Sequence, residues 1–180
     1  NAAFGFTGPT TLNGNVTTAG GNITFNSAVT LGGNRTIDAG AGTATFTGAV
    51  NGTYSLAVNA GATVFSSTIG NSSALTDLTL TTDELTFGNT VNGTGTLTIT
   101  TKTTSRDINL NNGTSGLDLS TTQLGYITGF GNLIFGSTSN SGTMTLGTYS
   151  NWATPTHFKT GGSGSIVVSG AQTATGSGTL

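Results

Sequence analysis

The sequence predicts an all-β chain that folds as a parallel β-solenoid with about 20 residues per coil. A recurring phenylalanine, a Gly- and Thr-rich composition, and short alternating segments between turn residues lead to this prediction. The phenylalanines Phe25, Phe46, Phe65 and Phe87 are spaced by 21, 19 and 22 residues, and a β-branched residue follows each one at the fourth position. This period is too short for a pair of helices, whereas stacked coils would place equivalent side chains about 4.8 Å apart.

Each coil is expected to contain two strands that point apolar side chains into one interior. Leucine stands ten positions after Phe46 and after Phe87, and a β-branched residue stands twelve positions after three of the phenylalanines. This period of two is typical of strands with one buried face. The predicted core ladder comprises Phe25, Val29, Ile37, Phe46, Val50, Val58, Phe65, Ile69, Phe87, Val91 and Ile99.

The repeat unit that begins at Phe65 departs from this spacing. After Phe65 the leucines stand at the tenth, thirteenth and fifteenth positions, as Leu75, Leu78 and Leu80. We therefore expect an insertion within residues 71–77 that bulges outward. Solenoids accommodate such insertions because each coil contacts only its neighbours.

We expect a single continuous array over residues 1–180, with regular coils over about 20–101 and less regular coils over about 102–180. The basic pair Lys102 and Arg106, beside Asp107, predicts an exposed loop at the start of the second part. Alternating strand segments then continue at residues 107–110, 116–119, 133–135, 144–146 and 165–168. Neither residues 1–4 nor residues 176–180 show a polar helix or charged loop that could cover an open strand edge, so we expect uncapped ends.

The composition supports a structural β protein. Charged residues make up 6% of the chain, where about 25% is usual, and 30 of the 180 residues are Gly. The net charge of −2 is too small for the low-hydrophobicity, high-charge signature of disorder. Threonine favours strands and Asn-Gly favours tight turns, so the two main biases agree with the repeat. There is no cysteine and no apolar run of 18 residues, so we expect neither thiolate metal sites nor a membrane span.

Residues for catalysis are scarce. The chain has six acidic residues and one histidine, His157, which lacks an accompanying nucleophile motif and is expected at the surface. The adjacent acids Asp83 and Glu84 are expected in a solvated turn, because neighbours in a strand point to opposite faces and cannot form a glycosidase pair. Residues 161–164 are expected to form a turn, since no Asp follows the glycines as a calcium repeat requires. Four basic residues and a net negative charge disfavour nucleic-acid binding. We expect a protein that is not an enzyme and uses no cofactor or metal.

The segment 149–159 departs from the repeat, and it contains the only Trp and the only His of the chain. It also contains Pro155, which predicts a loop leaving the coil because proline is poorly tolerated inside a central strand. One hypothesis is that Tyr149, Trp152 and His157 form an exposed contact for carbohydrate or a receptor. The alternative, which we favour, is that the aromatic side chains pack onto the flank of the solenoid.

Three segments carry a resemblance to a known family. Residues 116–136, together with the units at 22–25 and 45–52, resemble the large filamentous-haemagglutinin-like proteins of bacteria. This resemblance implies a right-handed parallel β-helix, export through a two-partner or related secretion route, and a long surface filament that acts in adhesion or biofilm. It implies no catalytic residues.

We therefore expect a non-catalytic, structural or adhesive segment of a bacterial extracellular filament or surface adhesin, located outside the cell or on its surface. Its expected partners are further coils of the same chain or identical copies end to end, and cell-surface glycans or receptors. An alternative is a self-assembling filament subunit that stacks through open strand edges. A carbohydrate-binding or carbohydrate-cleaving β-helix is a more distant alternative.

Overall fold

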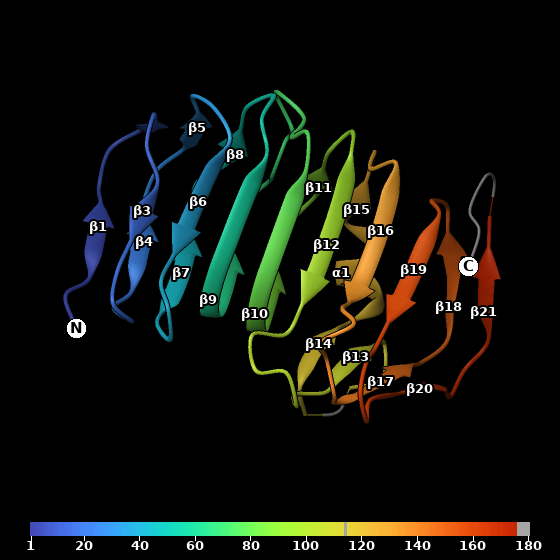
Figure 1. The fold of residues 1–180 in the computed structure, drawn as a ribbon. Helices are drawn as coiled ribbons and strands as arrows, with labels where there is room; N and C mark the ends of the chain where they lie inside the picture. The colour runs from blue at the N-terminus through green and yellow to red at the C-terminus, as the bar shows by residue number, and fades with distance from the viewer. Residues whose placement is uncertain (114, 176–180) are drawn as a thin grey trace.

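The computed structural model describes residues 1–113 and 115–175, and it shows a β-solenoid of parallel strands (Figure 1). The chain makes about eight turns of about 22 residues, slightly more than the repeat predicts. The strands run across the solenoid, and each pairs with strands of the neighbouring coils, so the fold class predicted from the phenylalanine period is confirmed.

The strands form three columns along the solenoid. The first column contains β1 (Phe4–Phe6), β4 (Ile23–Phe25), β7 (Thr43–Phe46) and the second halves of β9 (Leu56–Phe65) and β10 (Leu78–Phe87). The second contains β2 (Thr10–Leu12), β5 (Val29–Leu31), β8 (Val50–Asn51), an isolated bridge at Ile69, β11 (Val91–Asn92) and β15 (Ile127–Thr128). The third contains β3 (Val16–Thr17), β6 (Arg35–Asp38), the first halves of β9 and β10, β12 (Thr96–Thr100), β16 (Asn132–Gly136) and β19 (Thr156–Lys159).

The remaining elements belong to the later coils. A four-stranded sheet at the bottom of Figure 1 contains β13 (Ile108–Leu110), β14 (Leu117–Leu119), β17 (Thr143–Leu146) and β20 (Ser165–Val168). A separate pair contains β18 (Tyr149–Trp152) and β21 (Gln172–Ala174), and the short helix α1 (Thr121–Gly125) precedes β15. The predicted loop lies between β12 and β13, where residues 103–105 are exposed while the flanking Lys102 and Arg106 are half-buried. Residues 161–164 form the expected turn.

The predicted ladder lies in register inside the solenoid. Phe25 pairs with Phe46, Phe46 with Phe65, and Phe65 with Phe87. Adjacent rings are stacked with centroids 5.0, 4.7 and 6.0 Å apart, and Phe6 extends the stack at 4.7 Å from Phe25. All eleven predicted ladder residues are buried. Close stacking of this kind is favourable beyond the area it removes from water, so the repeat in the sequence becomes a continuous aromatic column.

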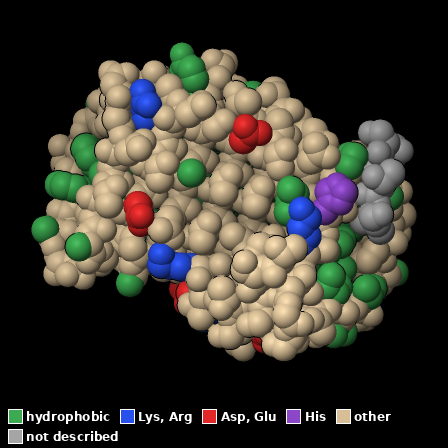
Figure 2. All heavy atoms as spheres, in the orientation of Figure 1, with side chains coloured by type: hydrophobic (Ala, Val, Ile, Leu, Met, Phe, Trp, Pro, Cys, Tyr) green, Lys and Arg blue, Asp and Glu red, His purple; other side chains and the backbone are tan. Residues whose placement is uncertain are grey.

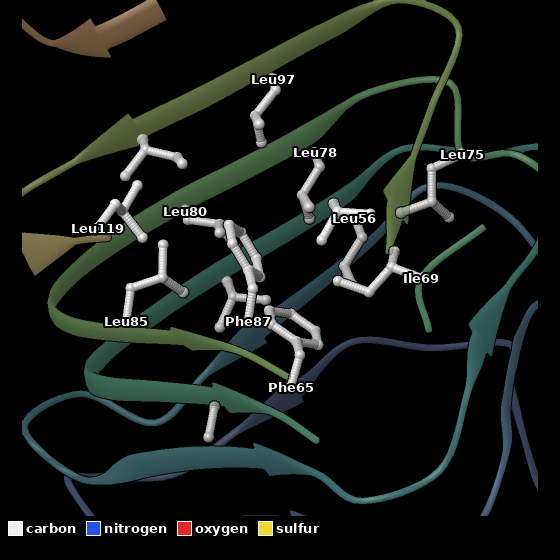
Figure 3. Packing of buried hydrophobic residues seen from close by; sticks show 14 of the residues in the cluster. Leu56, Phe65, Ile69, Leu75, Leu78, Leu80, Leu85, Phe87, Leu97 and Leu119 are labelled. Atoms are coloured by element: carbon white, nitrogen blue, oxygen red, sulfur yellow. The ribbon is translucent and has the colours of Figure 1, made fainter. Parts of the chain in front are cut away.

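The insertion within residues 71–77 bulges as predicted, while Leu75 turns back into the interior. Asn71 and Ser72 are exposed, whereas Leu75 is fully buried and bridges Gly93 of the next coil. Beyond the bulge the register is restored, since Leu80 pairs with both Val58 and Ile99. Figure 3 shows Leu56, Leu78 and Leu97 following one another from coil to coil, with the rings of Phe65 and Phe87 beside them.

The predicted turn at Asp83 and Glu84 is wrong. Both residues lie within β10, a ten-residue strand that continues from the third column into the first. β9 bends in the same way, and at its bend a Cβ on Gly61 would lie 2.4 Å from the Ala41 carbonyl oxygen of the preceding coil. The acids are tolerated in β10 because their side chains point outward, where Glu84 is exposed.

Asparagine and aspartate side chains connect successive coils at the corners. The Oδ1 atoms of Asn15, Asn22, Asn34 and Asn51 each accept a hydrogen bond of 2.9–3.0 Å from a backbone N–H 21 residues later. Asp77, Asp83 and Asp107 also accept a backbone N–H of a later coil, at 2.7–2.8 Å, from donors 19, 20 and 36 residues further along the chain. These bonds satisfy backbone donors at positions where the strand ladder is interrupted.

Candidate functional site

The three residues predicted for carbohydrate or receptor contact do not come together as an exposed site. The predicted loop at 149–159 is wrong, because Tyr149 and Trp152 lie on β18 and His157 lies on β19. Tyr149 and Trp152 are buried, whereas His157 is exposed on the outside of the third column. Pro155 stands between the two strands, where its missing N–H does not interrupt a ladder.

Trp152 is the centre of an aromatic cluster inside the later coils. Its ring meets Tyr149, Phe158 and Phe135 edge to face, with centroids 4.6, 5.4 and 5.9 Å away. Its indole Nε1–H donates to Oε1 of Gln172 at 3.0 Å. Both the apolar ring and its polar N–H therefore have partners, as a buried tryptophan requires.

The second column of strands is interrupted next to this cluster. β15 pairs with β11, and β18 pairs with β21, but no backbone hydrogen bond joins β15 to β18 in the described part of the chain. The two coils come together again beyond the gap, where Leu133 N–H donates to the Pro155 carbonyl at 2.9 Å. The interruption separates two strands that would otherwise be neighbours in the column.

A partly open pocket of about 240 Å³ occupies this interruption. Its lining residues come from α1, β15, β16 and β18 and from the segments that follow β15 and β18: Leu124, Gly125, Ile127, Thr128, Gly129, Leu133, Tyr149, Asn151, Trp152, Ala153 and Thr154. The buried members are Leu124, Leu133, Tyr149 and Trp152, and the exposed members include Thr128 and Asn151. The pocket thus has an apolar and aromatic interior and a hydroxyl and amide rim, and none of the described residues that line it is charged.

Tyr149 keeps its proton in this setting. Burial raises the pKa of the Tyr149 hydroxyl above its ordinary value of 10.0, and a hydrogen bond with the Asn151 side chain partly offsets that rise. The phenol is therefore neutral at physiological pH and can act as both donor and acceptor.

A second hollow lies at the end of the described solenoid. It has a volume of about 400 Å³ and is lined mainly by β19 and β20, with His157, Phe158, Ile166 and Val168 among its residues. Ile166 and Val168 pair with the buried Met144 and Leu146, so they occupy core positions of the last described coil. They are nevertheless 43% and 62% exposed. This hollow is thus lined by core positions of the last described coil. The predicted uncapped end at residues 176–180 lies outside the described residues.

The charged side chains hold structural contacts. Arg106 lies 3.5 Å from Glu84 and also donates to the Asp83 carbonyl at 2.8 Å. Lys102 donates to Asn59 at 2.6 Å, and Asn59 donates to Asp38 at 3.0 Å. Figure 2 shows a surface of mainly uncharged polar groups with few, scattered charges.

Within residues 1–113 and 115–175, no three His, Cys, Asp or Glu side chains lie close enough to hold a metal ion together. The same residues contain no helix that is long and apolar enough to cross a membrane.

Comparison of the chain with protein-family models, with curated proteins and with solved structures finds no match.

Proposed function

We propose that this chain is a structural segment of a bacterial extracellular filament or surface adhesin, and that it is not an enzyme. The observation that carries this proposal is the unbroken interior column from Phe6 to Phe87, held in register by parallel strands. A core of this kind extends in one dimension by adding coils, which suits a stalk or fibre.

Acidic side chains of the chain also support a structural role. The carboxylates of Asp77, Asp83 and Asp107 accept backbone N–H groups of later coils. These side chains connect coils, as the corner asparagines do. The low charge and hydroxyl-rich exterior fit a surface polymer whose stability comes from packing and backbone pairing.

Immunogold electron microscopy of the source cells tests this proposal. Antibodies raised against the folded chain should label fibres on the cell surface or in the medium, and deletion of residues 20–101 from the gene should shorten the fibres. Labelling confined to the cytoplasm would contradict the proposal. The matched control is an antibody that recognises only the unfolded chain.

Self-assembly end to end is a second candidate, favoured by the apolar strands at both described ends. Phe4 is 48% exposed on β1, and Val168 is 62% exposed on β20. Both residues occupy inward positions of their coils, since Phe4 pairs with Ile23 and Val168 pairs with Leu146. In this arrangement β1 of one copy would add to the open edge of β20 in the next.

Sedimentation velocity over a range of concentrations separates the two candidates. A self-assembling subunit should form larger species as concentration rises, and Val168→Lys should prevent this because it places a charge in the junction. Sedimentation as a monomer at every concentration would exclude self-assembly through these edges. Cryo-electron microscopy of the native fibre would then show whether the coils continue covalently.

A further inference from the structure

We propose that the pocket between β15 and β18 binds a single neutral, polyhydroxylated ring, that is, one uncharged sugar unit. The inference is independent of the filament role, because the pocket is formed by the packing of two particular coils. Four observations carry it: the interrupted strand column, the chemistry of the lining, the absence of charge in it, and its size.

The interruption leaves backbone groups facing the pocket. Val91 N–H donates to the Tyr126 carbonyl and Gly93 N–H donates to the Thr128 carbonyl, so these flanking residues of β15 face β11. In a parallel strand the residue between them directs its own N–H and C=O to the opposite side, and that residue is Ile127. The side away from β11 is the side of the gap, where β18 does not pair with β15.

A hydroxylated ligand suits this mixture of groups. Each ligand hydroxyl can donate one hydrogen bond and accept two, so it can satisfy an N–H and a C=O at the same edge. The rim adds the hydroxyls of Thr128 and Thr154, which donate to the Val91 and Phe130 carbonyls at 3.5 and 3.3 Å and can still accept. It also adds the amide of Asn151, whose Oδ1 accepts from Thr175 at 3.2 Å and whose NH2 group can donate. Leaving such groups without partners when a ligand displaces water would be costly, which disfavours a purely apolar occupant.

The interior of the pocket suits the C–H face of a sugar ring. Leu133 and the buried aromatic side chains of Tyr149 and Trp152 form one wall. Aromatic side chains with one apolar face and one polar edge are well suited to a ligand that also has both. The neutral phenol of Tyr149 adds a donor and acceptor without adding charge.

Charge and size narrow the ligand class. Among the residues that the structure describes, no Lys, Arg, His, Asp or Glu lines the pocket, so these residues offer no charged partner for a sulfated, phosphorylated or carboxylated sugar. The pocket volume is about 240 Å³. It lies below the range of about 300–1,000 Å³ that encloses drug-sized ligands, and it is of the size of a single pyranose ring.

Trp152 provides a direct readout, because it is the only tryptophan in the chain and lines the pocket. The experiment titrates the full chain with the methyl glycosides of glucose, galactose, mannose and N-acetylglucosamine, up to about 10 mM, and follows Trp152 emission. We expect at least one glycoside to give a saturable change with a Kd near 1 mM. Glucuronic acid and cyclohexanol, the charged and the apolar counterparts, should give none.

Two variants and one control connect the signal to the pocket. Asn151→Ala removes a rim amide and should weaken binding at least tenfold, and Ala153→Phe fills the opening and should abolish binding. Asn132→Ala makes the same chemical change as the first variant at an exposed residue outside the pocket, and it should bind as the parent chain does. Unfolding midpoints measured for each variant separate loss of the site from loss of the fold.

Repeating the titration with the four free reducing sugars identifies the source of the sugar. Binding of methyl glycosides indicates a unit at the end of a glycan, since the anomeric oxygen is substituted, whereas binding of the reducing sugar alone indicates a free sugar. The proposal is overturned if no sugar gives a saturable signal, if glucuronic acid or cyclohexanol binds as well as the glycosides, or if Ala153→Phe binds unchanged.

Discussion

The phenylalanine stack of the early coils and the Trp152 cluster of the later coils fill the same solenoid in different ways. In the stack, rings of one residue type lie nearly parallel, at interplanar angles of 8–14° from Phe6 to Phe65. In the cluster, Trp152 meets its three aromatic neighbours at 66–74°. In the stack each coil contributes the same kind of side chain at the same position. In the cluster one central side chain, Trp152, gives the later coils a packing that no other described coil repeats. The pocket lies at that cluster.

The stack ends where the chain changes its path. After Phe87 the chain completes its coil through β11 and β12, and it then forms β13, β14 and α1 before it reaches β15 in the second column. Phe87 N–H donates to Oε1 of Gln123, 36 residues later, at 2.9 Å. A side chain of α1 thus takes the place of a backbone partner. This longer coil separates the regular region from the irregular one.

The largest expected effect comes from breaking the stack. Phe46→Ala removes a fully buried ring between two stacked neighbours and should lower the free energy of unfolding by about 3–5 kcal/mol, measured by urea denaturation. Thr45→Ala, on the outward face of the same strand, should change it by less than about 0.5 kcal/mol. Thr47→Ala should cost slightly more, about 0.5–1.5 kcal/mol, because its hydroxyl donates to the Phe25 carbonyl at 2.8 Å. Equal losses at Phe46 and Thr45 would contradict the inward and outward assignment.

A smaller loss of stability is expected from a substitution in the Trp152 cluster. Trp152→Phe keeps an aromatic ring but leaves a void and removes the hydrogen bond to Gln172, so we expect a loss of about 1–3 kcal/mol. Hydrogen exchange should increase in β18 and β21 and stay unchanged in β4 and β7, because coils contact only their neighbours. Ser150→Ala, exposed on the same strand, is the control. Faster exchange throughout the chain would show that the two regions unfold together.

One buried hydroxyl in the regular region lacks a hydrogen bond. Thr63 is fully buried between Ala44 and Leu85 in the ladder, and its Oγ1 has no hydrogen-bond partner. Thr63→Val should therefore raise the free energy of unfolding by about 1 kcal/mol. Thr82 is equally buried, but its hydroxyl donates to the Glu84 carbonyl at 2.8 Å, so Thr82→Val should lower stability by a similar amount. Urea denaturation midpoints that shift in the same direction for both variants would refute this explanation.

The smallest effect is confined to alkaline pH and to the later coils. Well below pH 10 the Tyr149 hydroxyl is protonated in both the folded and unfolded chain, so it adds no pH dependence there. Above pH 10 the unfolded chain loses this proton first, because burial raises the pKa in the folded state, and stability falls as pH rises. Urea denaturation over about pH 8–11 should show a shallower decline for Tyr149→Phe than for the parent chain. Tyr54→Phe, at an exposed tyrosine, should leave the decline unchanged.

The regular region was predictable because each of its core positions recurs. Phe25, Phe46 and Phe65 appear at nearly constant spacing, and the structure stacks them as expected. The bulge predicted from the displaced leucines after Phe65 is also confirmed. Beyond the bulge, Leu80 pairs with Val58 on one side and with Ile99 on the other. The corner asparagines were missed, although their acceptor bonds 21 residues ahead follow the same period and could have been sought.

The candidate site was not predictable in the same way. The aromatic positions of Tyr149 and Trp152 do not recur in other coils, so no repeat marks these two buried residues as part of the core. The nearby Pro155 also favoured the prediction of a loop. The pocket comes from strand pairing that does not form between β15 and β18, which no local pattern encodes. The shortness of β15 was no signal, since β8 and β11 of the same column are equally short and pair on both sides.

The direction of the strands also determines how the molecule should respond to force. The strands lie across the solenoid, so the hydrogen bonds between coils point along its length, and a pull on the two ends loads them one coil after another. Each released coil of about 22 residues would add roughly 70 Å of extended chain. Single-molecule stretching should therefore show a series of small, similar steps. A stalk built from such coils would lengthen under load and limit the tension that reaches whatever holds its tip.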